Sequence, residues 1–236
     1  MSNARKLIET FGRSTGLFIP VIHHAGKAAT VESIRIAQDA GADGVCLIDQ
    51  GIPWSDLIQS LPYLRRAFPN MPIGLNLLAA PPCIGAPGQR RAVGHADFHW
   101  TDHRDSFADP LEEPWLGGVA FKTEGPVHPD AYPGHISTAL SEGATVCVTS
   151  GPGTGLAAPL EKVRALRALL DVGAARTGVE PFLGLASGVT VENVEQYLGS
   201  VDLFLVASGI ERVFGRLDPE LTDALAEKIH FGGAPE

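Results

Sequence analysis

The sequence has few cysteines, few aromatic residues and no long apolar run. Its three cysteines, Cys46, Cys83 and Cys147, are odd in number and widely spaced, which argues against a disulfide framework and favours a reducing compartment. No stretch of roughly 18 consecutive apolar residues occurs, so we expect no membrane span. Residues 1–11 alternate polar and apolar side chains and lack the apolar core of a signal peptide. These absences predict a cytoplasmic protein.

Positive charge is also scarce. The chain has 18 Lys and Arg against 27 Asp and Glu, a formal net charge of −9. No basic stripe of the kind that nucleic-acid binders carry is present, so we expect no nucleic-acid partner. Because the overall charge is negative, an anionic substrate needs a local site built from backbone amides and helix dipoles.

Short apolar runs alternate with helical patterns along the chain, which is typical of parallel βαβ units. The length of 236 residues suits one (β/α)8 barrel, for which roughly 200–250 residues are usual. We therefore expect an α/β fold, a single TIM-barrel domain over residues 1–236. The eight predicted strands are 17–23, 44–49, 72–78, 96–101, 119–123, 145–149, 182–186 and 203–207.

The predicted helices between these strands are uneven. A cluster of prolines and glycines over 81–88 leaves no room for a full helix after strand 3, and we expect reduced helices after strands 3 and 4. Residues 1–16 are expected to form a helix that plugs the bottom of the barrel. The loop 102–118 is long enough for a lid, a fixed wall or a dimer contact. The other predicted helices are 30–40, 55–68, 133–141, 159–174, one that opens near Thr190 and one that begins at Asp218.

Two successive predicted strands end in the same dipeptide. Ser187-Gly188 follows the seventh strand and Ser208-Gly209 follows the eighth. Glycine lets backbone amides approach an anion closely, and a helix amino terminus behind the turn adds a favourable dipole. Loops after strands 7 and 8 form the recurrent phosphate site of this fold. We therefore predict that Ser187, Gly188, Ser208 and Gly209 bind phosphate. The alternative is that the glycines only make tight turns.

A third glycine-rich segment follows the sixth strand. It reads Thr149-Ser150-Gly151-Pro152-Gly153-Thr154-Gly155. Its backbone could reach the same ligand from a third direction, and we expect Thr149, Ser150 and Gly151 to bind substrate. A flexible loop without ligand contact is the alternative interpretation.

These segments resemble the BtpA/SgcQ family. The resemblance is carried by residues 148–155, 186–194 and 206–210. It extends over about 145–229 and over 19–76, and it fails over 80–118, where a proline-glycine stretch replaces the helix that the family usually has after strand 3. The resemblance implies a ribulose-phosphate-binding-type barrel. BtpA is associated with photosystem I assembly and SgcQ with a sugar-utilisation gene cluster, so the resemblance implies a fold better than a reaction.

Candidate catalytic groups stand at the carboxyl ends of strands, where active sites of this fold lie. Asp49, after strand 2, could act as a general base, bind a ribose hydroxyl or cap a loop. Lys122 could bind phosphate, act as an electrostatic catalyst or form a Schiff base. Its alternative role is an ion pair with Glu124 or Asp49. Asn76 and Glu124, near the ends of strands 3 and 5, are expected to contact substrate.

Histidines are concentrated near two strands. Of the adjacent His23 and His24, one should face the barrel interior and the other the helix layer; His23 is our third catalytic candidate, and a buried, hydrogen-bonded histidine is the alternative. A divalent metal site near strand 4, completed by His23, is conceivable, but the spacing matches no specific metal signature. We therefore predict no cofactor, and these polar residues could equally fill the barrel mouth. The residues near strand 4 are His95, Asp97, His99, Thr101, Asp102 and His103.

Together these features predict an enzyme that acts on a phosphorylated sugar or a phosphoribosyl or nucleotide-like small molecule. Isomerisation, carbon–carbon cleavage and glycosidic or phosphoribosyl transfer all use a phosphate handle with an acid–base pair, and the motifs do not rank them. Two alternatives stay open: a non-catalytic assembly or biogenesis factor similar to BtpA, and a metal-dependent hydrolase centred on strand 4. A homo-oligomer is possible.

Overall fold

A closed barrel of eight parallel strands forms the centre of the protein. The computed structural model describes residues 1–78, 96–102, 112–178 and 180–232. Within them the strands neighbour one another in chain order, and β1 (Leu17–His23) pairs with β8 (Leu203–Val206) to close the barrel. The predicted (β/α)8 TIM-barrel fold is thereby confirmed. The other strands are β2 (Val45–Ile48), β3 (Ile73–Asn76), β4 (Phe98–Thr101), β5 (Trp115–Gly118), β6 (Val146–Ser150) and β7 (Leu183–Ala186).

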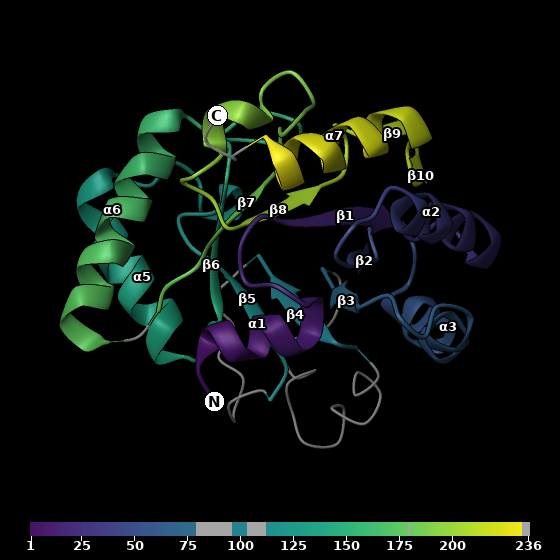
Figure 1. The fold of residues 1–236 in the computed structure, drawn as a ribbon, viewed down its shortest axis with the longest axis horizontal. Coiled ribbons are helices and arrows are strands. Elements are labelled where there is room, and N and C mark those ends of the chain that lie inside the picture. Colours follow the sequence, from purple (N-terminus) through teal and green to yellow (C-terminus); the bar gives the residue numbers. More distant parts are fainter. Residues whose placement is uncertain (79–95, 103–111, 179, 233–236) are drawn as a thin grey trace.

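Helices cover the outside of this barrel. In Figure 1, α2 (Lys27–Asp39) and α3 (Trp54–Ala67) lie to the right, and α5 (Tyr132–Ser141) and α6 (Leu160–Thr177) lie to the left. The helix α7 (Pro219–Phe231) packs beside β1 and α2, and Asp218 caps its first turn, as its sequence predicts. Residues 79–95 and 103–111 lie outside the described part of the chain. The predicted reduced helices after β3 and β4 concern these residues.

The amino-terminal helix α1 (Asn3–Phe11) plugs the bottom of the barrel, as predicted. Ser2 caps it by accepting a hydrogen bond from the Arg5 amide at 3.3 Å. Its apolar residues Leu7 and Phe11 are buried in the cluster that fills the barrel interior, and the Phe11 ring contacts Phe98 edge to face at 5.1 Å. Because this end is closed by apolar side chains, ligand chemistry is left to the opposite, carboxyl end of the strands.

Alternation along each strand divides the core into two layers. In β1, Leu17, Ile19 and Val21 belong to the interior cluster, whereas Phe18 and Ile22 pack against the helices. The interior is therefore filled by side chains and is not a channel. Within the described residues, no helix is both long and apolar enough to cross a membrane.

The fifth strand differs from its prediction. It spans Trp115–Gly118, not 119–123, and the short 3-10 helix η2 (Lys122–Glu124) lies where the end of the strand was expected. Gly117 and Gly118 made this strand hard to recognise, because glycine has a low β-propensity. Neighbouring groups occupy the space that their side chains would need: a Cβ on Gly118 would lie 2.2 Å from the Asp102 carbonyl oxygen. Because β5 ends earlier, Lys122 begins η2 above the barrel mouth.

The segments after β7 and β8 also differ from expectation. The helix expected near Thr190 is reduced to the 3-10 helix η4 (Val194–Tyr197), because Gly199, at φ +76°, turns the chain soon after it. After β8 the chain forms a hairpin of β9 (Glu211–Val213) and β10 (Arg216–Leu217) before α7. The sequence analysis did not anticipate this hairpin.

Candidate functional site

The loops after β5, β6 and β7 converge on the Lys122 side chain. Its Nζ donates hydrogen bonds to Ser187 Oγ at 3.0 Å and to Thr154 Oγ1 at 3.3 Å. Its backbone amide donates to Ser150 Oγ at 2.9 Å. Burial lowers the pKa of Lys122, and the nearby Asp102 carboxylate acts in the opposite direction. Lys122 therefore places a positive charge among hydroxyl groups at the carboxyl end of β7.

Ser187 itself has an unusual backbone. Its φ is +71°, in the left-handed region, and Ala120 is the other non-glycine residue with positive φ in the described part of the chain. Such a conformation is unfavourable for a residue with a Cβ and persists where surrounding contacts hold it. Asn193 stabilises the same turn, since its Nδ2 donates to the Gly188 carbonyl at 2.7 Å and its Oδ1 accepts from the Thr190 amide at 2.9 Å.

The glycines of the predicted cradle are in close contact with other backbone segments. A Cβ on Gly188 would lie 2.2 Å from the Leu156 carbonyl carbon, and one on Gly151 would lie 1.9 Å from the Leu156 carbonyl oxygen. A Cβ on Gly209 would lie 2.0 Å from the Val189 carbonyl oxygen. These glycines thus allow the loops after β6, β7 and β8 to pack directly on one another. This packing fits the tight-turn interpretation and also brings the three loops together.

Several amides in these loops donate no hydrogen bond within the described structure. Among hydrogen bonds between described residues, none has the backbone N–H of Gly188, Ser208 or Gly209 as its donor. Ser208 is exposed, and a Cβ on Gly155 would lie 3.6 Å from its Oγ. Free amides, hydroxyls and a lysine ammonium are the groups that bind phosphate in proteins. The arrangement can therefore bind a small anion.

The two adjacent histidines separate as expected. Val21 and Ile22 establish the alternation that turns His23 toward the interior, and His24 bonds instead to Thr30 Oγ1 on α2 at 2.7 Å. Burial lowers the pKa of His24. His23 lies between two acceptors: its Nδ1 is 2.7 Å from Glu211 Oε1 and its Nε2 is 3.0 Å from Gln50 Oε1.

Phe214, at the tip of the β9–β10 hairpin, covers the His23 ring. The two rings stack with centroids 4.2 Å apart, and Phe214 remains 57% exposed. Glu211 is fixed in turn by the Gly215 amide, which donates to its Oε1 at 3.0 Å. A histidine held by a carboxylate in this manner has the arrangement of a general acid–base group. The hairpin that sequence reasoning missed therefore supplies the partner of His23.

Asp49 and Asn76 are both buried and engaged with protein groups. Asp49 is 1% exposed, and its Oδ1 accepts a hydrogen bond from the Leu78 amide at 2.7 Å. Asn76 Nδ2 donates to Asp102 Oδ1 at 2.9 Å. These bonds give Asp49 the loop-capping contact considered as its alternative role. They also bring Asp102, at the end of β4, beside a predicted substrate residue.

The remaining predicted substrate residues lie in η2 after β5 and at the carboxyl end of β6. Ser150 and Gly151 are buried under the loop that carries Lys122. Thr149 is fully buried, and its hydroxyl has no hydrogen-bond partner in the described structure. Glu124 Oε2 lies 2.9 Å from His135 Nδ1 on α5. Thr149 and Glu124 thus lie toward the helix layer, beside the mouth.

Of the described polar residues near β4, Asp102 lies at the mouth beside Asn76, whereas Asp97 does not. Asp97 lies before β4, at the amino end of the barrel, where it forms an ion pair with Arg65 and accepts from the Ile73 amide at 2.7 Å. His99 is partly buried, and desolvation lowers its pKa to about 4. His95 and His103 lie outside the described residues. Among the residues that are described, no group of three or more His, Cys, Asp or Glu is placed to hold a metal ion.

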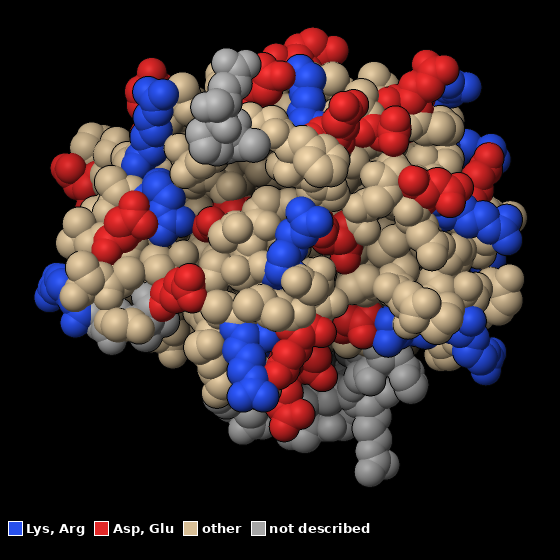
Figure 2. Space-filling view, in the orientation of Figure 1, with Lys and Arg blue, Asp and Glu red and all other residues tan. Residues whose placement is uncertain are grey.

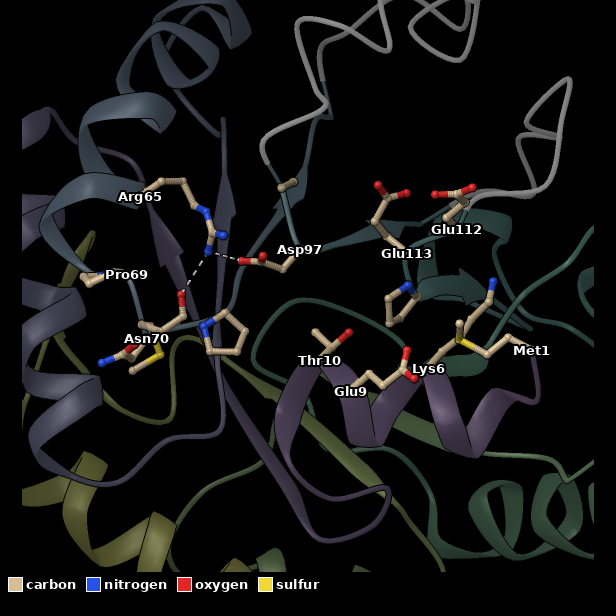
Figure 3. Close-up of a pocket in the computed structure, with 14 residues that line it drawn as sticks. Met1, Lys6, Glu9, Thr10, Arg65, Pro69, Asn70, Asp97, Glu112 and Glu113 are labelled. Carbon is tan, nitrogen blue, oxygen red and sulfur yellow. Dashed lines mark hydrogen bonds and ion pairs between the residues drawn. The ribbon is translucent and has the colours of Figure 1, made fainter.

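A groove of about 520 Å³ lies at the opposite, amino end of the barrel (Figure 3). Residues of α1, including Lys6 and Glu9, line it together with Arg65, Asp97 and Glu113. Four of its titratable side chains are acidic and two are basic, so an anionic ligand would be disfavoured there. The amino face of this fold normally serves stability. We therefore place the functional site at the other end.

Sequence reasoning missed four residues of the mouth. Thr154 and Glu211 follow glycine turns that were recognised, but their side chains were not considered as partners of Lys122 and His23. Gln50 follows Asp49 directly, and Asp102 was assigned only to the possible metal cluster. The signal that could have found them is position, since each follows the carboxyl end of a strand.

On the face shown in Figure 2, acidic and basic side chains are intermingled.

Comparison with solved structures supports the fold. The chain is similar to the tryptophan synthase alpha chain from Legionella pneumophila (15% identity, TM-score 0.66, 100% of both chains covered). It is also similar to the native KDPGal structure (19%, 0.65, 92% of this chain and 95% of that one). A third is phosphoribosyl anthranilate isomerase from Thermus thermophilus (19%, 0.60, 91% and 98%). At these identities the likeness shows the TIM-barrel fold. No protein-family model matches the chain, and no curated protein matches it in sequence.

Proposed function

We propose that this protein is an enzyme that acts on a phosphorylated sugar or on a phosphoribosyl or nucleotide-like small molecule. Its phosphate is bound by the loops after β7 and β8, at Ser187, Gly188, Ser208 and Gly209. The observation that most strongly supports this proposal is the contact of Lys122 Nζ with Ser187 Oγ and Thr154 Oγ1. A lysine charge that rests on neutral hydroxyls is available to an anion placed beside them.

The proposed catalytic groups flank this phosphate site. Lys122 approaches from the β5 side, and His23 lies on β1, which neighbours β8. His23 is suited to proton transfer because Glu211 orients its ring while Gln50, an exposed residue, can yield its place at Nε2 to a substrate oxygen. Asp49 is the third proposed group, and the Leu78 amide holds its Oδ1 in place.

Names of the similar structures support this class of substrate. One of them is named for a phosphoribosyl compound that it isomerises. The resemblance to the BtpA/SgcQ family is compatible with the same site. A cytoplasmic location and a homo-oligomeric state are part of the proposal, and no metal or cofactor is required by it.

Thermal unfolding in the presence of paired ligands tests the proposal. Ribose 5-phosphate, other sugar phosphates and nucleotides are each compared with their unphosphorylated counterparts. A ligand that binds only the folded state at about 100 times its Kd adds about 2.7 kcal/mol of stability. We expect stabilisation by the phosphorylated member of a pair only. Stabilisation by neither member would contradict the proposal and favour the non-catalytic assembly factor.

A pair of lysine substitutions locates the binding. Lys122→Met removes the charge at the proposed site, whereas Lys6→Met removes a charge at the amino-end groove. Both change the net charge equally. We expect Lys122→Met to abolish the phosphate-dependent shift and Lys6→Met to retain it. The reverse result would place the ligand in the groove.

A further inference from the structure

Lys162 is a second lysine near the mouth, and its side chain bonds to two backbone carbonyls. It lies in the first turn of α6, and its Nζ donates to the Ala120 carbonyl at 2.6 Å and to the Ser150 carbonyl at 2.8 Å. Burial lowers its pKa to about 8, and Glu124 opposes this effect. The ammonium group is thus partly desolvated, and the two short hydrogen bonds compensate for the lost water.

The two carbonyls belong to the segments that position Lys122. Ala120 has a left-handed backbone, with φ +46°, two residues before Lys122. Ser150 ends β6, and its Oγ accepts the Lys122 amide at 2.9 Å. Lys162 therefore holds both the strained turn that precedes Lys122 and the residue that binds its backbone.

A non-glycine residue in the left-handed region is sterically unfavourable and needs contacts that hold it. The described contact of the Ala120 carbonyl with a charged donor is such a contact, because hydrogen bonds to charged groups are the strong ones. Without it, the turn after β5 could relax, and the direction of the Lys122 side chain would change with it.

We propose that Lys162 is a positioning residue for phosphate binding: it fixes the turn after β5 so that Lys122 points at Ser187. This inference rests on the proposed function. Two of the three N–H groups of Lys162 bond to the Ala120 and Ser150 carbonyls, so its ammonium is directed at the backbone, and the proposal assigns it no contact with the ligand. Its effect on phosphate affinity must therefore pass through Lys122.

A double-mutant cycle tests this directly, with inorganic phosphate as the probe. Dissociation constants are measured by calorimetry for the wild-type chain, Lys162→Met, Lys122→Met and the double variant. We expect Lys162→Met to weaken phosphate binding about tenfold, which is the change expected from the loss of one charge-assisted hydrogen bond. In the Lys122→Met background the same substitution should have no further effect. Arg164→Met, an exposed position on the same helix, is the matched control and should leave affinity unchanged.

The outcomes separate the two proposals. If Lys122→Met weakens phosphate binding and Lys162→Met does not, or if their effects are additive, the positioning role is wrong and the proposed function stands. If wild-type protein does not bind phosphate, the proposed function fails. In that case hydrogen exchange decides the structural part of the inference: exchange over residues 119–124 must be faster in Lys162→Met than in Arg164→Met, and equal rates overturn it.

A second variant covers the possibility that Lys162→Met does not fold. Lys162→Arg retains the charge, but a planar guanidinium does not replace a compact ammonium between two carbonyls. We expect about threefold weaker phosphate binding in this variant, again only when Lys122 is present. Equal weakening in the presence and absence of Lys122 would overturn the inference.

Discussion

Lys122 Nζ lies 3.0 Å from Ser187 Oγ, and this contact joins the loop after β5 to the loop after β7. These two strands are not neighbours, since β6 lies between them. The lysine therefore spans part of the barrel mouth and brings a positive charge to the turn that the sequence identifies as a phosphate cradle. The protein carries a net charge of −9, which disfavours anions overall. The positive charge of Lys122 offsets this repulsion locally and favours anion binding at the turn.

We expect the backbone of Ser187 to lower the stability of the fold and its hydroxyl to strengthen phosphate binding. Its φ of +71° is unfavourable for a serine and favourable for glycine. Ser187→Gly should raise the free energy of unfolding by up to about 1 kcal/mol, whereas Ser187→Ala, which keeps a Cβ, should not. Both variants lose the hydroxyl, so both should bind phosphate more weakly. Urea unfolding and calorimetry measure the two effects, and a less stable glycine variant would contradict the strain argument.

Gly188 and Gly178 form a matched pair, because both have φ +69°. A Cβ on Gly188 would lie 2.2 Å from the Leu156 carbonyl carbon, whereas a Cβ on Gly178 would have nothing within 4 Å. Gly178→Ala should cost about 1 kcal/mol of stability, from the backbone alone. Gly188→Ala should cost at least about 3 kcal/mol, from backbone strain and overpacking together. Equal costs in urea unfolding would show that the loops after β6 and β7 are not packed as described.

His99 should make the fold sensitive to acid. Burial lowers its pKa to about 4 in the folded protein, from 6.5 for the unfolded chain. Between these values the unfolded state binds more protons, so stability falls as the pH drops from about 6.5 to about 4. This difference in pKa between the folded and unfolded states corresponds to at most about 3.4 kcal/mol of stability.

His99→Gln removes this contribution, and its unfolding free energy should fall less than that of wild type over the same pH range. His128→Gln, at a position whose side chain is 78% exposed, serves as the control and should follow the wild-type curve. Parallel curves for wild type and His99→Gln would show that desolvation does not lower the pKa of His99 in the folded protein.

The fold could be predicted from the sequence to a large extent. Seven of the eight strands were placed correctly, because β-branched and apolar runs such as Val45–Ile48 are bounded by glycine and polar residues. The capping sequence Asp218-Pro219 located the last helix. The fifth strand was missed because it contains Gly117 and Gly118. Close packing of neighbouring groups is the reason for these glycines, and a single sequence does not display that packing.

The candidate site was predicted only in its backbone part. The Ser-Gly pairs could be recognised because their residue type and position both have a physical meaning in this fold. The side-chain partners could not, since Lys122 and Ser187 are 65 positions apart and Glu211 is 188 positions from His23. Lys162 was overlooked for a further reason: on an amphipathic helix a lysine is normally solvent-exposed, and its contacts with two carbonyls depend on the turn after β5.

Backbone amide chemical shifts measured during a titration with inorganic phosphate test the central claim most directly. We predict that the amide signals of Gly188, Ser208 and Gly209 move on addition of phosphate, and that they do not move in Lys122→Met. Signals at the amino-end groove, such as those of Thr10 and Asn70, should stay in place. Unchanged signals for the three cradle amides, with or without shifts at the groove, would contradict a phosphate site at the ends of β7 and β8.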